Sequence, residues 1–203
     1  VATACAALPL AAFAMGGASG PKTTYETQGH LGEIIVNPYK VAPLTAVIRN
    51  GGYVIEKAKV TVLPKAGGVP ISYDVSRRML LTHGGIPVFG LYADYVNKVR
   101  VEYTRVFNGK AENFDDTYDI YASPMYGEAQ GLRFQKSAFP RVKPVKVDPK
   151  FKDRLYLLNN AADLAGKAAH MVWNNPMGGA LEWSFYPQNG VVDTTGEYRW
   201  YLF

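Results

Sequence analysis

Residues 31–48 read LGEIIVNPYKVAPLTAVI, and this stretch decides the fold. Two apolar runs, Ile34 to Val36 and Leu44 to Ile48, lie on either side of the turn-forming Asn37-Pro38. A residue that precedes proline disfavours helical backbone angles, and this applies both to Asn37 and to Ala42 before Pro43. β-branched residues in both runs favour extended pairing. The stretch therefore predicts a strand, a turn and a second strand.

The same pattern continues to residue 122. Val54 to Leu63 and Asn97 to Val106 alternate between apolar and charged residues, as half-buried antiparallel strands do. Asn108-Gly109 predicts a tight hairpin turn, and Pro87 suits a strand start or a sheet edge. Further strands are expected at Ile71 to Val75, Gly84 to Tyr92 and Asn113 to Tyr121. About seven strands and no strong helix predict an all-β fold, with an immunoglobulin-like β-sandwich over residues 31–122.

Composition narrows the class of protein further. An apolar content of 48% with 13% aromatic residues excludes a disordered chain. Thirteen prolines and twenty glycines among 203 residues favour a turn-rich β fold. The net charge of +5 forms no basic stripe interleaved with aromatics, so we expect no nucleic-acid partner. Cys5 is the one cysteine, which excludes an internal disulfide and a cysteine metal site.

The first fourteen residues, VATACAALPLAAFA, resemble the end of a secretory signal peptide. They are apolar and end in Ala12-Phe13-Ala14, so we expect cleavage before Met15, a polar lead-in over residues 15–30 and a periplasmic protein. The run is too short to span a membrane, and no membrane association is predicted. A lipoprotein site at Cys5 is an alternative that the sequence leaves open.

Residues 123–153 break the strand pattern with four prolines and a surplus of lysine and arginine. We interpret them as a solvated linker rather than an anion-binding surface.

Residues 154–203 return to short aromatic strands. Strands are expected at Arg154 to Asn159, His170 to Trp173, Leu181 to Tyr186, Val191 to Asp193 and Glu197 to Phe203. The run DTTGEYRW predicts a tight turn followed by a strand, as in a β-propeller blade. One blade has nothing to pack its faces against and cannot close a ring. We therefore expect the start of a propeller that is cut off at Phe203.

The chain resembles the N-terminal portion of the bacterial, PAPS-independent aryl-sulfate sulfotransferases. The resemblance rests on GEIIVNPYKVAPLTAVI, on IPVFGLY with the nearby Asn97-Lys98-Val99, on FKDRLYL at residues 151–157 and on DTTGEYRW. It implies a β-sandwich followed by a six-bladed propeller, and a homodimer. It also implies transfer of a sulfuryl group from a phenolic sulfate to a phenol acceptor through a sulfated histidine. Those catalytic residues would lie in later blades, so this chain is expected to be an inactive scaffold without a cofactor.

No residue of this chain is predicted to be catalytic, cofactor-binding or metal-binding. His30 and His83 are expected to be exposed loop histidines without a partner, and His170 a core or surface residue. We interpret Arg199 as part of an ion pair on the blade, with a sulfate ligand as the alternative. The aspartates form no calcium-loop spacing: Asp74, Asp94, Asp115, Asp116 and Asp119.

A second hypothesis is a standalone exported binding module without catalysis, whose aromatic strands present a surface to a partner or glycan. A complete small hydrolase or metalloenzyme is disfavoured, because no Ser-His-Asp, Cys-His or H-E-x-x-H pattern is present.

Overall fold

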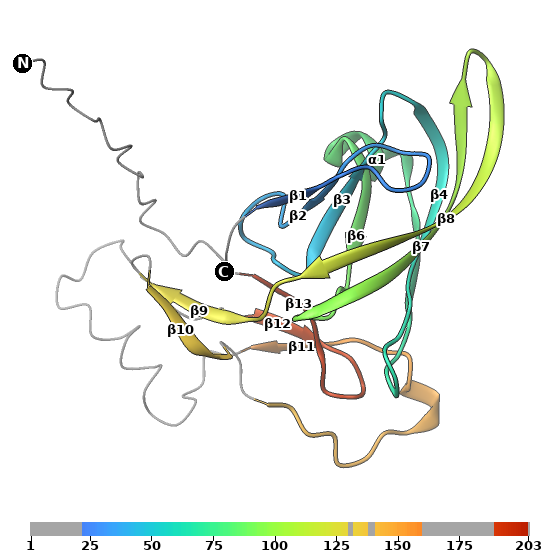
Figure 1. Cartoon of the computed structure of the whole chain (residues 1–203). Helices are drawn as coiled ribbons and strands as arrows, with labels where there is room; N and C mark the ends of the chain where they lie inside the picture. Colours follow the sequence, from blue (N-terminus) through green and yellow to red (C-terminus); the bar gives the residue numbers. More distant parts are fainter. Residues whose placement is uncertain (1–21, 130–131, 138–140, 160–188, 203) are drawn as a thin grey trace, which may run out of the picture.

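A computed structural model describes residues 22–129, 132–137, 141–159 and 189–202. Two four-stranded antiparallel sheets pack face to face in Figure 1, which confirms the predicted all-β sandwich. The first sheet contains, in spatial order, β1 (Thr23–Tyr25), β2 (Ile34–Val36), β3 (Thr45–Arg49) and β6 (Gly85–Phe89). The second contains β5 (Ile71–Val75), β4 (Val54–Val62), β7 (Tyr95–Phe107) and β8 (Lys110–Ala122).

The core lies between these two sheets. Alternate residues of β4 and β7, including Val60 and Val101, are fully buried, while Lys59 and Arg100 between them face solvent. Ile34 and Ile48, from the stretch that opens the fold, meet as cross-strand partners and are also fully buried. The period-two pattern of the sequence therefore gives each strand its inner and outer face.

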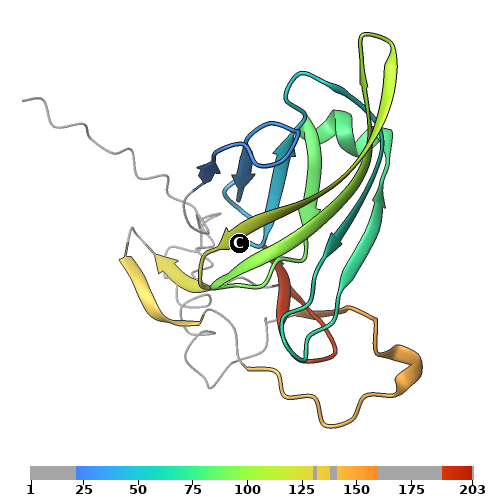
Figure 2. The same ribbon diagram turned by 45° about the vertical axis from the view of Figure 1, so that its right-hand side comes forward.

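The longest hairpin joins β7 to β8 and extends beyond the other strands in Figures 1 and 2. Its turn residues Asn108 and Gly109 have φ angles of 48° and 77°. Two successive positive φ angles define the turn whose twist matches the flanking strands. The predicted Asn-Gly hairpin is confirmed.

Pro87 also lies where its chemistry predicts. β6 is an edge strand, and Pro87 pairs with Val47 on its inner side. On the open side, the Tyr73 hydroxyl donates to the Pro87 carbonyl oxygen (3.0 Å) and accepts from the Phe89 N–H (2.7 Å). A side chain of β5 thus covers the free edge of the opposite sheet, which limits pairing with another chain.

Five short elements were not expected. Arg77–His83 forms helix α1, capped by the Ser76 hydroxyl, which accepts from the Met79 N–H (3.3 Å), and ended by Gly84 at a φ of 62°. β1 lies in the expected lead-in, because its backbone completes the edge of β2. The expected linker contains the hairpin of β9 (Tyr126–Ala129) and β10 (Leu132–Ser137), and the 3₁₀ turn Pro149–Phe151. These elements form through capping side chains and backbone hydrogen bonds, and the sequence shows no periodic pattern of apolar residues over them.

A third sheet contains β11 (Tyr156–Asn159), β12 (Asn189–Val192) and β13 (Tyr198–Leu202). It confirms the strands expected around residues 154–159, 191–193 and 197–203, whereas those expected at 170–173 and 181–186 lie outside the described residues. Val192, Tyr198 and Tyr201 belong to the same core as the sandwich. The expectation that this segment has nothing to pack against was wrong, because the sandwich itself supplies the apolar surface.

Candidate functional site

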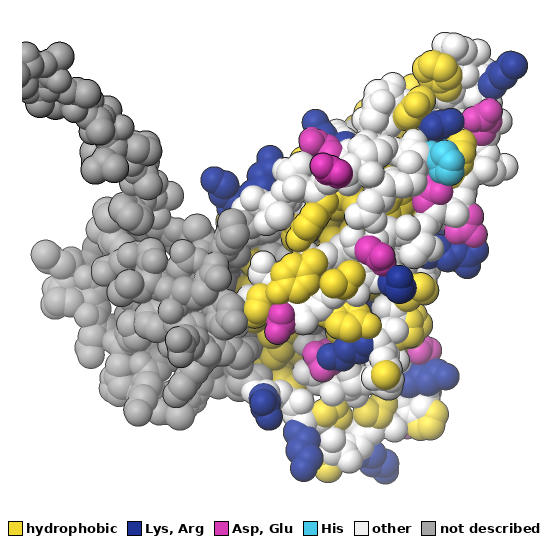
Figure 3. Space-filling view, viewed as in Figure 1, with side chains coloured by type: hydrophobic (Ala, Val, Ile, Leu, Met, Phe, Trp, Pro, Cys, Tyr) yellow, Lys and Arg dark blue, Asp and Glu magenta, His cyan; other side chains and the backbone are white. Residues whose placement is uncertain are grey.

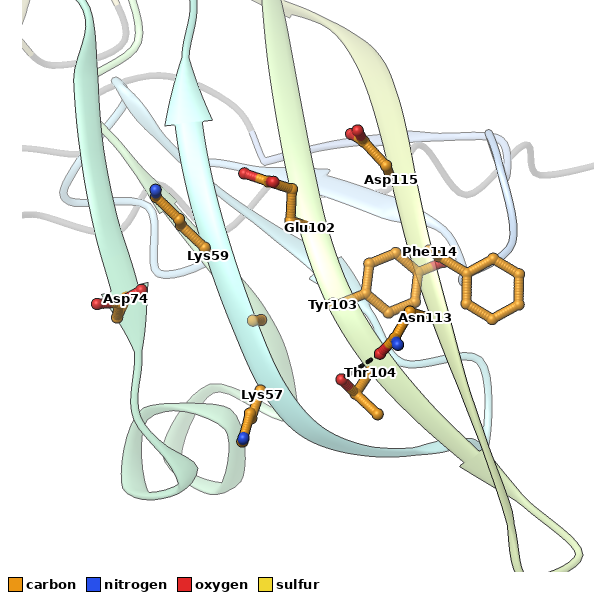
Figure 4. Close-up of a pocket in the computed structure, with 10 residues that line it drawn as sticks. Lys57, Lys59, Asp74, Glu102, Tyr103, Thr104, Asn113, Phe114 and Asp115 are labelled. Carbon is orange, nitrogen blue, oxygen red and sulfur yellow. Dashed lines mark hydrogen bonds between the residues drawn. The ribbon is translucent and has the colours of Figure 1, made fainter.

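The outer face of the second sheet carries a polar hollow of about 430 Å³, shown in Figure 4. Its side chains form rows across the strands. In one row Lys57 of β4 lies beside Thr104 of β7, which lies beside Asn113 of β8. The next row crosses all four strands and contains Asp74, Lys59, Glu102 and Asp115. The outward half of each strand's alternation thus builds the hollow.

Charges in the hollow are partly neutralised within it. Arg100 Nε donates to Asp115 Oδ1 (2.8 Å), and this bond holds the pKa of Asp115 below its usual range. The Thr104 hydroxyl donates to the Asn113 side-chain oxygen Oδ1 (2.8 Å). Among the described residues, Lys57 and Lys59 have no ion-pair partner. The hollow therefore offers two ammonium groups and an amide as hydrogen-bond donors.

Such an arrangement can bind a small polar ligand, but the hollow contains no nucleophile held by a base. It is shallow and open, and its two rows together contain charges of both signs. The space-filling view in Figure 3 shows lysine, arginine, aspartate and glutamate side chains mixed over the face of the molecule that it presents. We therefore assign it no catalytic step.

A second polar cluster surrounds Asp116 on the inner face of β8. Its carboxylate accepts from the Tyr103 hydroxyl (2.8 Å), the Tyr118 hydroxyl (3.1 Å) and the His30 backbone N–H (3.1 Å). His30 Nδ1 lies 2.9 Å from Asp116 Oδ1. Partial burial by itself raises the pKa of Asp116, but the hydrogen bonds from Tyr103, His30 and Tyr118 outweigh it and lower the pKa.

This cluster corrects the expectation for His30, which has an acidic partner although its side chain is 56% exposed. The partner lies 86 residues away in the sequence, so no local signal connects the two. The sequence does contain a signal for Asp116, because the alternation of β8 places this residue among the inward-facing ones. A carboxylate on an inner face needs donors around it.

Arg199 joins the third sheet to the sandwich. Its guanidinium forms a buried ion pair with Asp193 (2.8 Å) and donates to the carbonyl oxygens of Gly90 and Val69 (2.9 Å each). Its Cζ lies 3.7 Å from the centre of the Tyr92 ring. The predicted ion pair is confirmed, but it lies inside the molecule, with both side chains fully buried. A sulfate has no access to it.

The turn that presents Arg199 is built from Asp193. Asp193 Oδ1 accepts from the Thr195 N–H (2.9 Å), the Thr195 hydroxyl (2.6 Å) and the Glu197 N–H (3.2 Å). Gly196 has a φ of 86°, and a Cβ there would collide with the Val142 carbonyl oxygen. The run DTTGEYRW therefore works as a turn and a buried ionic contact, which we call the Arg199 clamp: Asp193, Arg199 and Tyr92.

His83 also differs from its expectation. It is the last residue of α1, half-buried, and its Nδ1 lies 2.6 Å from the Tyr39 hydroxyl. His170 lies outside the described residues. Within the described ranges no three histidine, cysteine, aspartate or glutamate side chains converge as a metal site. No described helix is long and apolar enough to cross a lipid bilayer.

The fold is an immunoglobulin-like β-sandwich whose core also includes residues of a third sheet. Its polar sites are the open hollow on the second sheet and the hydrogen-bonded groups around Asp116 and Arg199. Residues 33–123 match the family described as the arylsulfotransferase Ig-like domain. The match covers the sandwich from β2 through β8. It confirms the predicted resemblance to aryl-sulfate sulfotransferases.

Two curated relatives extend the similarity to most of the chain. The protein named arylsulfate sulfotransferase AssT of Lelliottia amnigena is 41% identical over 209 aligned residues, which cover 97% of this chain and 34% of the relative. The protein of the same name from Escherichia coli O6:H1 is 40% identical over 86% of this chain and 30% of its own length. This chain therefore spans about a third of the length of these relatives.

Proposed function

We propose that this chain is the N-terminal scaffold of a longer, exported aryl-sulfate sulfotransferase. The observation that carries the proposal is the 40–41% identity to proteins of that name over most of this chain. A scaffold role is supported by the sites themselves, since the described polar clusters hold hydrogen bonds and ion pairs within the fold.

In this proposal the reaction moves a sulfuryl group from a phenolic sulfate ester to a phenol. A histidine outside this chain accepts the group first, without PAPS, and then delivers it to the acceptor. A neutral imidazole is a competent nucleophile at physiological pH, and fixed cationic donors stabilise the charge that develops on the transferred group.

The third sheet has a place in this proposal as the first part of a β-propeller. Its antiparallel strands and its aspartate-glycine turn are typical of a blade. The Arg199 clamp would then fix the orientation of the first blade relative to the sandwich. We also propose export by the cleaved segment at residues 1–14 and a homodimeric full-length protein.

The full-length protein that contains this chain provides the test. We expect it to release 4-nitrophenol from 4-nitrophenyl sulfate over many turnovers only when a second phenol is present, and without added PAPS; donor alone should release a single equivalent. Donor alone should leave one sulfuryl group on a histidine, visible in the intact mass. The 203-residue chain should release no 4-nitrophenol. Turnover by this chain alone, or a requirement for PAPS, would contradict the proposal.

The polar hollow supports the second hypothesis, a binding module, because Lys57 and Lys59 leave their ammonium groups available. Titration of the chain with neutral and sulfated saccharides tests it. Binding that the double substitution Lys57→Ala and Lys59→Ala removes would favour this function. No binding at millimolar concentrations would leave the scaffold role as the better account.

A further inference from the structure

The loop between β2 and β3 presents an exposed phenol next to a base. The Tyr39 hydroxyl lies 2.6 Å from His83 Nδ1. With the imidazole neutral and its proton on Nε2, Nδ1 accepts the hydrogen bond that the phenol donates. Nucleophile and base within this distance are the signature of an activated hydroxyl.

Both side chains are held in place by their surroundings. Asn37 is buried, and its side-chain oxygen accepts from the Ala42 N–H (3.2 Å), which closes the loop that carries Tyr39. His83 ends α1, and its ring meets the Phe89 ring edge to face at 6.1 Å. The contact with Phe89 limits rotation of the imidazole, which keeps Nδ1 directed at the Tyr39 hydroxyl.

Tyr39 differs from the other tyrosines in exposure and in partner. Of the tyrosines whose side chains the structure describes it is the most exposed, at 54%. Tyr73 and Tyr92 donate to backbone carbonyl oxygens, and burial raises the pKa of both. Tyr103 and Tyr118 donate to the Asp116 carboxylate. The hydroxyls of these four tyrosines are hydrogen-bonded to acceptors inside the fold, where a donor molecule cannot reach them. The Tyr39 hydroxyl instead lies at the surface, beside the half-buried imidazole of His83.

We propose that Tyr39 is a sulfation site, with His83 as its general base and an aryl sulfate as the sulfuryl donor. The sulfuryl group first passes from the aryl oxygen, which leaves as phenolate, to the histidine of the catalytic part. The Tyr39 oxygen then forms a bond to the sulfur, and the bond from sulfur to that histidine nitrogen breaks with its electron pair on the nitrogen. The Tyr39 proton passes to His83 Nδ1 and then, through water, to the released phenolate. Tyrosine and aryl sulfate become tyrosine O-sulfate and phenol, with no change of oxidation state.

The choice of donor rests on the proposed function. The proposed enzyme removes a sulfuryl group from a phenol oxygen. The same transfer run in reverse places the group on a phenol oxygen, so its active site accepts a phenol as acceptor. Tyr39 is a phenol of that chemical kind, carried on the scaffold part of the protein. The group would reach it from the catalytic part of the same or a second molecule.

The test uses the 203-residue chain, 4-nitrophenyl sulfate and a small amount of the arylsulfate sulfotransferase from Escherichia coli O6:H1. Intact mass and peptide mapping locate any added sulfuryl group. We expect one group per chain, on Tyr39. Tyr39→Phe should remove it, and His83→Ala should slow it about 100-fold, the low end of the usual contribution of a general base. Added imidazole should restore the rate of His83→Ala, which a purely structural role would not allow.

Tyr156→Phe is the matched control, because Tyr156 is also exposed, at 43%, and should leave the added group on Tyr39. A free phenol in a parallel tube verifies that the relative transfers the group. No sulfuryl group on Tyr39, or equal labelling of Tyr39 and Tyr156, would overturn the proposal. Since the relative supplies the sulfuryl group, this result is independent of whether the full-length protein is itself a sulfotransferase.

Discussion

Arg199 is the residue on which the junction between the third sheet and the sandwich depends. Its charge is fully buried, and Asp193 and the Tyr92 ring compensate it from two sides. Among the residues that the structure describes, its Nη2 has no hydrogen-bond partner, so the charge depends on Asp193, the two carbonyl oxygens and the Tyr92 ring. Removing one partner of a buried ion pair leaves the other charge uncompensated, and this is more damaging than the absence of both.

We therefore expect Arg199→Ala to lower the free energy of unfolding by about 3–5 kcal/mol. Urea denaturation followed by circular dichroism measures this change. Arg78→Ala, at an exposed position of α1, is the control and should change the free energy by less than about 0.5 kcal/mol. A loss at Arg199 no larger than that of the control would show that the clamp does not stabilise the fold.

Asp116 is expected to make stability depend on pH. Its pKa in the folded protein lies below 3.8, the value of an unperturbed aspartate. The unfolded chain therefore binds a proton first as pH falls. The stabilisation is complete above about pH 5 and is lost as pH falls through 3.8 toward the folded pKa.

Urea midpoints measured between pH 6 and pH 3 test this dependence. The substitution Asp116→Asn should lower the midpoint at pH 6 and should weaken its fall with acid. Asp119→Asn is the control, because Asp119 is exposed and meets Lys98 at the surface. An Asp116→Asn variant with an unchanged acid profile would contradict the role given to this carboxylate.

Among the elements, β6 shows how a sandwich protects an edge. Tyr73 of β5 satisfies the Phe89 N–H and the Pro87 carbonyl oxygen with one hydroxyl. Tyr73→Phe leaves both groups without that partner, and we expect a loss of about 1–3 kcal/mol in the free energy of unfolding. Light scattering of the heated variant should also rise, since the edge is then open to another strand.

Tyr25→Phe provides the comparison for this element. Tyr25 donates to the Tyr121 carbonyl oxygen at the surface, over 3.3 Å, and its loss leaves a group that water can reach. Its expected effect is below about 0.5 kcal/mol. Equal effects of the two substitutions would mean that the Tyr73 hydroxyl contributes no more than a surface bond.

At the scale of the whole molecule, the sandwich and the third sheet share one core. Val192 and Tyr201 pack with the sandwich, and Lys65 pairs with Glu197 across the junction (2.6 Å). Units that share a core and hydrogen bonds from a buried side chain, such as those from Arg199 to the carbonyl oxygens of Gly90 and Val69, unfold together. The third sheet therefore depends on the sandwich for its stability.

All three tryptophans, Trp173, Trp183 and Trp200, lie in the last 44 residues, so fluorescence reports on that part of the chain alone. Far-ultraviolet circular dichroism reports mainly on the strands of the sandwich. We expect the two signals to give the same urea midpoint. An earlier fluorescence transition would show that this part of the chain opens before the sandwich.

Much of the fold could be predicted from local chemistry. The Asn-Gly turn, the edge position of Pro87 and the alternation of β4 and β7 each follow from one residue type or one period. Helix α1 could not, because its seven residues carry a serine cap and a glycine stop but too short an apolar pattern. Strand β1 could not be predicted either, because its three residues are extended only through their pairing with β2.

The partners of the polar side chains could not be predicted at all. His30 meets Asp116 across 86 positions, His83 meets Tyr39 across 44, and Arg199 meets Gly90 across 109. A pattern of neighbouring residues holds no information about partners that are so far apart in the sequence. The sequence therefore placed His30 and His83 in loops without a visible partner, whereas the fold supplies a partner to each of them.

The sequence by itself determined the sandwich and its turns, because alternation and turn chemistry act over a few neighbouring residues. Only the tertiary structure decided how the third sheet meets the sandwich, which carboxylate is buried and which phenol lies beside a base. Those contacts join residues that are far apart in the chain. They arise when the two sheets close, and the free energy of burying Arg199 and Asp116 then depends on every group brought around them.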